Sequence, residues 1–522
     1  MNAFQRKLLF ALFLVSFLLL AVGMNRDIWT ANEGQRAYPP IEMLLSGDWV
    51  VPRLNGDPYM KKPPLLYWML IPLYSVFGIH EWVARLPSVA SGLATVAVVF
   101  AWGLRLFQVK ESAGQDGSKS GLFDAQFWPA FIAAAIVATN MVFIDRGRNT
   151  DLDIHLCLFT TLAMWSMWQG LQGLSEGRGE RFWGVALACG GWLALANLLK
   201  IPVPFLFIGP GLVGVCLLAK RKDWLFRWEW VVAFGVSVVP FLIWAFWASL
   251  RVGSAEVSET FREELELRVH ASEINRGPIV FYLALSFGAF FPWCLGWLCL
   301  LNASIRRKFL GLGLTAQFLG SAVGFSLVAL SLIPAKESEY MVSAVPLMAL
   351  LMGFLIYSWA EEPFWAPKSW SMSRKKRVIL WAGFVIACVF GLAKYLQDEA
   401  KAKEGSFKEI AATMSRYEAD GFEVLIYRKK LPSLFYYLQT KYPRLRNSDE
   451  VADRMAAKDY KLLILLQRDL MNEWEDKLLL GNYSTIEFPE HRSNYLLLEL
   501  HTVDLDEEDA LPLGEQPEPE QT

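Results

Sequence analysis

Charged residues are scarce in this sequence. They make up 20% of its 522 positions, whereas hydrophobic residues make up 54% and include 22 Trp and 35 Phe. A soluble chain of this length would carry more charge and would divide into several domains. The formal net charge is only -2, so no overall field attracts the protein to nucleic acid. The composition therefore argues against a soluble or a nucleic-acid-binding protein.

Cysteines are also few, and glycine-rich nucleotide-binding loops are absent from the sequence. The six cysteines lie in or beside apolar stretches and lack neighbours with the spacing of zinc ligands. They are typical of small buried side chains, and they indicate no disulfide framework. The sequence contains no glycine-rich phosphate loop of the P-loop or dinucleotide-binding type and no cytosolic catalytic domain. A nucleotide-linked donor is therefore not expected.

Long apolar runs dominate the first 396 positions. About 20 apolar residues in a helix cross the hydrocarbon core of a membrane, so these runs predict transmembrane helices. The first run follows the basic segment "MNAFQRK", but "VGMNRDIW" after it lacks a small-residue cleavage pattern, so we expect a retained helix rather than a signal peptide. The eleven predicted spans are 8–24, 85–107, 128–144, 154–170, 182–198, 201–219, 230–250, 279–300, 315–333, 340–358 and 378–396.

Basic residues between the spans predict the orientation. "MNAFQRK", "LSEGRGER", "KRKDWLFR", "IRRK" and "SRKKR" are short, basic and fall on alternate sides. The positive-inside rule then places the N-terminus in the cytoplasm. The other side receives the segments 25–84, 145–153, 251–278, 334–339 and everything after 396. With an odd number of spans, the C-terminal region is extracytoplasmic.

Two regions outside the spans are predicted to fold. In the first outer loop, 25–84, "AYPPIEMLLSGDW" and "PPLLYWMLIPLYSVFG" are amphipathic but too short or too interrupted by proline to cross, so they predict interfacial helices. The region 397–505 alternates helix and strand patterns and predicts a small α/β accessory domain. The acidic, proline-rich tail 506–522 is typical of disorder.

Charged residues gather on the predicted outer side, close to the membrane. Ionisable groups at membrane depth are costly, so they tend to be paired and functional. Two groups of carboxylates among many cations suggest a site for an anionic, lipid-borne substrate. Cations would hold its phosphate, and a carboxylate would act as a general base.

The residues 32–88 carry a specific resemblance. Their sequence, "NEGQRAYPPIEMLLSGDWVVPRLNGDPYMKKPPLLYWMLIPLYSVFGIHEWVARLPS", resembles the first outer loop of bacterial membrane glycosyltransferases of the GT-C class. The resemblance is to the group that holds protein O-mannosyltransferases and the lipid A aminoarabinose transferase. Further similar segments follow in order and extend the resemblance from residue 8 to about residue 360: "RGRNTDLDIHLCLF", "LLKIPVPFLFIGPGL", "EELELR", "NRGPIVFYLALSFGAFFPW" and "SLIPAKESEYMVSAVPLMALLMG".

The resemblance implies a fold and an activity. The expected fold is an all-α polytopic membrane protein of about eleven transmembrane helices plus interfacial helices, the GT-C fold, with a small C-terminal α/β domain. Residues 1–396 would form the transmembrane catalytic domain. The implied activity is inverting transfer of a sugar from a polyprenyl-phosphate donor to lipid A, another glycan or a protein. The implied location is the extracytoplasmic face of the bacterial inner membrane, with membrane lipids as neighbours and no nucleic acid partner.

The resemblance also implies roles for single residues. Glu33 and Asp153 match the acidic motifs and would be catalytic; Asn32 stands where many members have Asp, so Glu33 is expected to be the base. The residues expected to bind substrate are Asn32, Arg36, Tyr59, Lys62, Asp151, Lys200, Arg268, Arg276, Lys336 and Tyr340. Structural alternatives stay open: Glu33 could pair with Arg36, Asp151 or Asp153 could cap a helix, and Lys62 could extend to the interface.

No metal cofactor is expected. Lys61 stands where the aminoarabinose transferase has a zinc-associated Glu, and Leu265 stands where it has a His, so the substitutions do not support a divalent metal. Two other functions remain possible, a transporter or flippase and a non-catalytic binder of polyprenyl-linked sugars. Transporters usually contain two related halves, and no internal repeat is visible. Asn32 gives the binder some support.

Overall fold

Two compact units make up the protein. The computed structural model describes residues 1–108, 119–179, 182–269, 277–360, 372–455, 460–474, 482–488 and 494–501. The units divide between Ser406 and Phe407. The sequence predicts a boundary at residue 396, but helix α17 (Met372–Gly405) continues past it without a break, so the observed boundary lies ten residues later. The predicted disordered tail lies outside the described residues.

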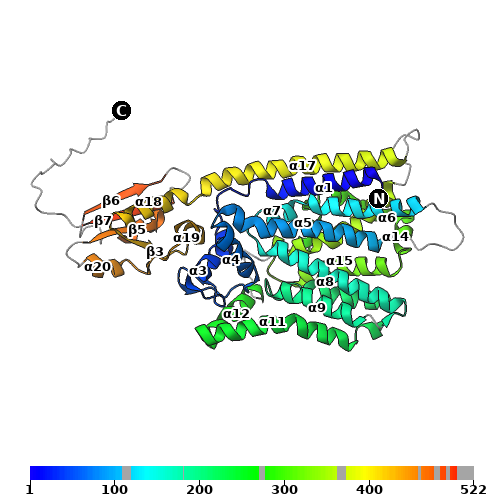
Figure 1. The fold of residues 1–522 in the computed structure, drawn as a ribbon, viewed down its shortest axis with the longest axis horizontal. Coiled ribbons are helices and arrows are strands. Elements are labelled where there is room, and N and C mark those ends of the chain that lie inside the picture. The colour runs from blue at the N-terminus through cyan, green and yellow to red at the C-terminus, as the bar shows by residue number, and fades with distance from the viewer. Residues whose placement is uncertain are drawn as a thin grey trace, which may run out of the picture. The chain divides into compact units, whose positions relative to one another are not determined.

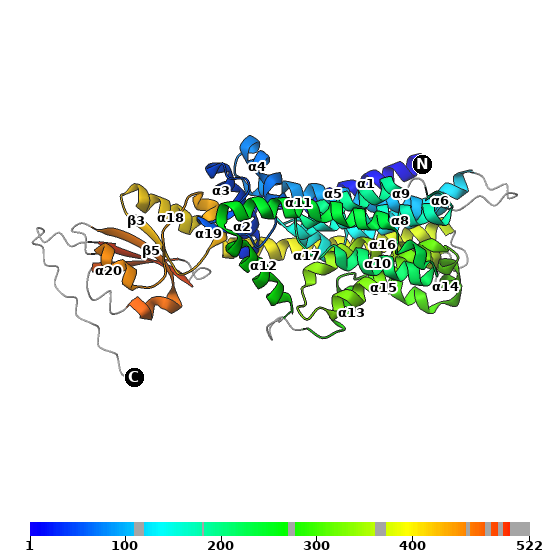
Figure 2. The same cartoon turned by 90° about the horizontal axis from the view of Figure 1, so that it is seen from below.

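The first unit is built from helices. Figures 1 and 2 show its long helices running along one common direction. These helices and the short ones between them are α1 (Ala3–Ala21), α5 (Glu81–Leu106), α6 (Lys119–Ala138), α7 (Met141–Gly147), α8 (Leu152–Ser175), α9 (Phe182–Asn197), α10 (Phe205–Leu218), η2 (Lys222–Trp224), α11 (Trp228–Val252), α12 (Ser254–Val269), α13 (Phe281–Gly288), η4 (Trp293–Leu301), α14 (Ala303–Leu310), α15 (Leu314–Leu332), η5 (Ser338–Ala344), α16 (Val345–Ala360) and α17.

The apolar helices indicate a multi-pass membrane protein. Each of the eleven predicted spans overlaps helical residues, but 128–144 and 279–300 each cover two helices separated by a break. Among the described residues, five helical segments are long and apolar enough to cross a membrane, and the count rises to seven if two bent pairs each form one span. The bends are 60° between α6 and α7 and 114° between α13 and η4. The count of eleven crossings stays a prediction.

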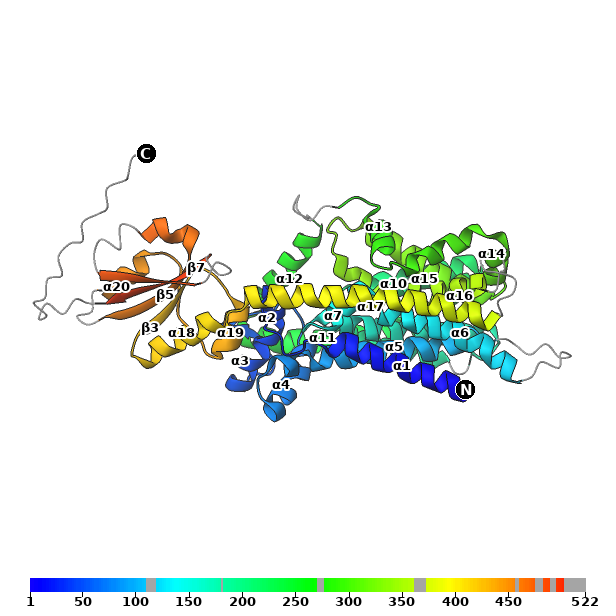
Figure 3. The same cartoon turned by 90° about the horizontal axis from the view of Figure 1, so that it is seen from above.

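The first outer loop folds into short elements. They are α2 (Ala31–Ala37), α3 (Pro39–Ser46), the hairpin β1 (Arg53–Leu54) and β2 (Asp57–Pro58), and α4 (Leu65–Phe77). Thr30 caps α2 because its Oγ1 accepts a hydrogen bond from the Glu33 amide, and Gly47 ends α3 in the left-handed conformation. Figures 1 and 3 show α3 and α4 at the end of the helical unit opposite the N-terminus. We call this end the loop end.

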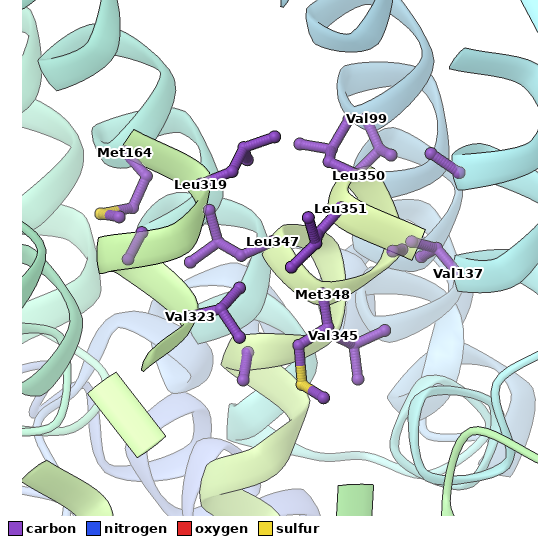
Figure 4. Packing of buried hydrophobic residues seen from close by; sticks show 14 of the residues in the cluster. Val99, Val137, Met164, Leu319, Val323, Val345, Leu347, Met348, Leu350 and Leu351 are labelled. Carbon is purple, nitrogen blue, oxygen red and sulfur yellow. The ribbon is translucent and has the colours of Figure 1, made fainter. Parts of the chain in front are cut away.

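Helix α16 lies at the centre of the apolar core. Figure 4 shows Val345, Leu347 and Leu351 of α16 packed among side chains of α5, α6, α8 and α15. Small residues allow close approach of neighbouring helices: a Cβ on Gly353 would lie 2.6 Å from the Pro129 carbonyl oxygen of α6. Helix α17 runs along α1, as Figures 1 and 3 show.

The second unit contains a five-stranded mixed sheet in the order β4-β3-β5-β7-β6. Strand β3 pairs in parallel with β4 and β5, whereas β7 pairs antiparallel with β5 and β6. Leu425, Ile464, Leu498 and Trp474 contribute to its buried core. Its elements are α18 (Lys408–Ala419), β3 (Glu423–Tyr427), α19 (Pro432–Leu438), β4 (Arg444–Leu445), α20 (Asp449–Met455), β5 (Lys461–Gln467), η7 (Arg468–Trp474), β6 (Asn482–Glu487) and β7 (Tyr495–His501).

The close contact of α16 with α6 makes Gly353 sensitive to substitution. We expect Gly353→Ala to lower the thermal unfolding midpoint of the detergent-solubilised protein, because overpacking destabilises by about 1–3 kcal/mol. Gly320→Ala in α15 is the matched control, since its Cβ would meet no atom within 4 Å. Equal midpoints for the two variants would contradict the packing of α16 against α6.

Candidate active site

Six charged side chains meet at the loop end. Each carboxylate pairs with one or two cations: Arg146 Nη1 lies 3.2 Å from Asp151 Oδ2 and 2.9 Å from Glu339 Oε1. Lys200 Nζ lies 2.9 Å from Asp153 Oδ1 and 3.6 Å from Glu339 Oε2. Arg36 Nη1 lies 3.5 Å from Asp151 Oδ2. The charged cluster, as we name it, consists of Arg36, Arg146, Asp151, Asp153, Lys200 and Glu339.

Asp151 has the geometry of a helix cap. It precedes α8, and its Oδ1 accepts a 2.7 Å hydrogen bond from the Asp153 amide. Burial opposes its ionisation, but Arg36 and Arg146 hold the pKa of Asp151 well below its usual value. Both of its oxygens are therefore engaged. The structure supports the cap that the sequence leaves open, and it adds two ion pairs.

Asp153 differs from Asp151 in having an oxygen with no partner. Its Oδ1 pairs with Lys200, whereas its buried Oδ2 has no hydrogen-bond partner among the described residues. Burial disfavours a charged lysine, but Asp153 and Glu339 hold the pKa of Lys200 above its usual value. The Lys200 ammonium also lies over the Tyr340 ring, 5.0 Å from its centroid. Asp153 therefore keeps one oxygen that can accept a proton.

Glu33 forms an ion pair with Arg85 that engages both of its carboxylate oxygens. Arg85 donates to it twice, from Nε to Oε1 at 2.8 Å and from Nη2 to Oε2 at 2.9 Å, and the Thr150 amide donates to Oε1 at 3.0 Å. Burial opposes ionisation of Glu33, but Arg85 keeps its pKa below the usual value. Arg36, the partner suggested from the sequence, pairs with Asp151 instead. This geometry is that of a structural anchor, and the base role stays a prediction.

Three other residues expected to bind substrate, Asn32, Tyr59 and Lys62, belong to the first outer loop. Asn32 is exposed, and its carbonyl oxygen accepts a hydrogen bond from Arg36. The Tyr59 hydroxyl donates to Gln35 Oε1 on α2 at 3.1 Å. Lys62 lies half-buried in the turn before α4.

Lys336 points elsewhere. Its ammonium donates to the Ser331 and Ile333 carbonyl oxygens at the end of α15, at 2.6 and 2.5 Å. It therefore caps that helix rather than joining the charged cluster. Arg268 is in the last turns of α12, where its side chain is not described, and Arg276 lies outside the described residues.

The sequence analysis assigned no role to three side chains that organise the site, Arg85, Arg146 and Glu339, although Arg146 is among the charged residues expected on the outer side. A weak signal existed for each. Arg85 is in "RLPS", Arg146 shortly precedes Asp151, and Glu339 is adjacent to Tyr340. No local pattern shows that Arg85 pairs with Glu33 or that Arg146 pairs with Glu339, because the partners are far apart in the sequence.

An apolar groove of about 310 Å³ lies between the first outer loop and α11. The indole N–H groups of Trp244 and Trp68 donate to the carbonyl oxygens of Val50 and Trp49, so their polar atoms are satisfied by the loop. Leu198 in the groove wall is two residues from Lys200 of the charged cluster. The lining residues are Val50, Trp68, Leu198, Pro240, Ile243, Trp244 and Trp247.

A metal centre is not evident in the described part of the chain. It contains no group of three or more His, Cys, Asp or Glu side chains placed to hold a metal ion. The carboxylates of the charged cluster are instead interleaved with cations.

Comparison with solved structures identifies the fold. The structure of ArnT from Cupriavidus metallidurans bound to undecaprenyl phosphate superimposes with a TM-score of 0.67, at 18% identity, over 94% of this chain and 97% of that one. The apo state gives a TM-score of 0.70. The chain has the GT-C fold. The archaeal oligosaccharyltransferase AglB from Archaeoglobus fulgidus, also of this fold, gives a TM-score of 0.50 at 14% identity over 94% of this chain and 74% of that one.

The chain is also similar in sequence to curated arabinosyl transferases. An undecaprenyl phosphate-alpha-4-amino-4-deoxy-L-arabinose arabinosyl transferase of Erwinia tasmaniensis is 26% identical over 292 residues, which are 55% of this chain and 48% of that protein. The transferase of the same name from Serratia proteamaculans is 25% identical over 389 residues, which are 74% of this chain and 64% of that protein. The chain thus spans less than two thirds of the length of these relatives. No protein-family model matches it.

The closed pair of Glu33 with Arg85 predicts a stability effect. Glu33→Gln leaves the Arg85 guanidinium buried without its counter-charge, so we expect the free energy of unfolding to fall by about 3 kcal/mol. The exposed neighbour in the same helix provides a control, Asn32→Ala, which should change stability by less than about 0.5 kcal/mol. Thermal unfolding in detergent compares the two. A similar shift for both variants would argue against the anchor.

Proposed function

We propose that the protein is an integral-membrane glycosyltransferase that uses a polyprenyl-phosphate sugar donor. The observation that carries this proposal is the charged cluster, four of whose six members are buried, with an apolar groove whose wall residue Leu198 is two positions from Lys200. A lipid-linked phosphate needs cations for its head and apolar surface for its chain. The similarity to arabinosyl transferases and to a structure holding undecaprenyl phosphate supports the same chemistry.

The reaction would be a direct displacement at the anomeric carbon. The acceptor oxygen forms a bond to that carbon while the bond to the phosphate oxygen breaks, so the configuration inverts. The acceptor proton passes to a carboxylate, and the polyprenyl phosphate leaves with its negative charge. Lys62, Arg36, Arg146 and Lys200 are the described cations that could stabilise this charge, as fixed positive groups do for anionic transition states.

Asp153 is the carboxylate that we assign as the general base. Its Oδ2 is unengaged among the described residues, whereas both oxygens of Glu33 accept hydrogen bonds from Arg85. A base needs a free oxygen within reach of the acceptor proton. In this assignment Glu33 has a structural role. The Asn at position 32, where many family members have Asp, then does not deprive the site of its base.

The proposed arrangement in the membrane follows the loop charges. The N-terminus is cytoplasmic, eleven segments cross the bacterial inner membrane, and the loop end is extracytoplasmic. The unit after residue 406 then also lies outside and acts as an accessory α/β domain. Lipid A, another glycan and a protein are all compatible acceptors.

A transfer assay tests the proposed reaction. Purified protein in nanodiscs receives undecaprenyl-phosphate-linked labelled sugars and candidate acceptors. We expect Asp153→Asn to lower kcat by about 100-fold or more while donor binding is retained, because a general base contributes at least this much. Glu33→Gln, compared at equal folded fraction, should keep more activity than Asp153→Asn.

Other outcomes separate the alternatives. Donor binding without turnover by the wild type would identify a binder, and sugar-lipid movement across liposomes without transfer would identify a flippase. Full turnover by Asp153→Asn would refute the assigned base.

The apolar groove predicts a second effect. Ile243→Trp fills it, so we expect the dissociation constant for undecaprenyl phosphate to rise about tenfold, a loss of about 1.4 kcal/mol. Leu242→Trp is the control, because its side chain is on the same helix and 56% exposed but does not line the groove. Unchanged binding in both variants would exclude the groove as the site of the lipid chain.

A further inference from the structure

Three polar side chains form a stripe on α5. Arg85, Ser88 and Ser91 are three residues apart, so they occupy one face of the helix. All three are buried, which is unusual for side chains in an otherwise apolar helix. We call them the α5 stripe. Ser88 and Ser91 contact the start of α8, where Asp151 and Asp153 are located, and Arg85 is linked to it through Glu33.

Arg85 acts on this start through Glu33. The guanidinium fixes the carboxylate with two hydrogen bonds, and the carboxylate accepts from the Thr150 amide at 3.0 Å. Arg85 Nη1 also donates to the Met24 carbonyl oxygen at 2.7 Å. One side chain therefore ties the segment after α1, helix α2 and the turn before α8 to α5.

The two serines contact α8 directly. The Asp151 amide donates to Ser88 Oγ at 3.3 Å, and Ser91 Oγ lies 2.7 Å from His155 Nδ1 in a buried hydrogen bond. Asp153 is located between these two contacts in the sequence. The first turn of α8 is thus held at residues 150, 151 and 155, before and after Asp153.

We propose that the α5 stripe positions Asp153 for catalysis. This inference rests on the proposed function. Contacts at three points fix the position of the first turn of α8 along the helix axis and its rotation about that axis. The rotation keeps Asp153 Oδ1 on Lys200 and leaves Oδ2 for the acceptor. A displacement of about 1 Å can lower a rate about 100-fold, so such constraint matters for turnover.

A neighbouring hydroxyl supplies the contrast. Thr95, one turn after Ser91, is also buried, but its Oγ1 donates to the Ser91 carbonyl oxygen of its own helix at 2.8 Å. Its removal deletes a buried hydroxyl of α5 whose hydrogen bond stays within that helix. Thr95→Ala is therefore the matched control for the two serines.

The test compares the double variant Ser88→Ala/Ser91→Ala with Thr95→Ala in the full-length protein. Two readouts are used, kcat and KM for the undecaprenyl-phosphate sugar, and hydrogen exchange of the amides from 150 to 155. We expect the double variant to lose at least about tenfold in kcat with donor KM within about twofold. Exchange at 150–151 should become faster in the double variant, and Thr95→Ala should match the wild type in both readouts.

The outcomes separate this inference from the proposed function. Unchanged kcat and exchange in the double variant would overturn the positioning role, as would an equal loss in Thr95→Ala. A rise in KM with unchanged kcat would also overturn it, since that pattern reports lost donor binding. If the wild type transfers no sugar, the proposed function fails, whereas the exchange comparison still decides whether the stripe holds the turn.

Discussion

The ion pair of Arg85 with Glu33 joins the parts of the protein that form the loop end. A buried guanidinium and a buried carboxylate lose hydration that only good mutual geometry can replace. Here the two parallel hydrogen bonds, the backbone carbonyl oxygens and the Thr150 amide satisfy most of both groups. The pair therefore constrains α2, α5 and the start of α8 together, and the candidate site depends on all three.

Two carboxylates of the charged cluster, Asp151 and Asp153, are at the start of α8 that this pair holds in place. Three cations and three carboxylates lie close together, so their charges largely compensate each other in a poorly hydrated place. Such a network is neutral as a whole, yet its members can change partners. An incoming phosphate could compete for Lys200 or Arg146, which are now held by carboxylates. The arrangement suits a site whose substrate brings its own negative charge.

The groove offers the apolar surface that the chain of a lipid-linked substrate also needs. Trp68 and Trp244 in its wall have their N–H groups bound to carbonyl oxygens of the first outer loop, so these two rings present apolar surface to the groove. The Trp244 hydrogen bond holds the loop against α11, and the Trp68 hydrogen bond holds α4 against the loop's own backbone. Loop order and groove shape are therefore linked, and both depend on residues that the sequence motif around "SGDWVVP" contains.

The sequence by itself determined the apolar segments, the presence of short helices in the first outer loop and the resemblance to GT-C enzymes, and the structural comparison confirms that resemblance for the fold. These features are local: apolar length, proline positions and motifs can be read within one segment. It also placed Arg36, Asp151, Asp153, Lys200 and Tyr340 in one site, and the structure brings these residues together.

Only the tertiary structure decided which charged residues pair with each other. Glu33 meets Arg85 across 52 positions, Arg146 meets Glu339 across 193, and Lys336 turns to its own helix end. Which oxygen stays free is a property of such long-range contacts, because a buried charge takes whichever counter-charge the packing brings within reach.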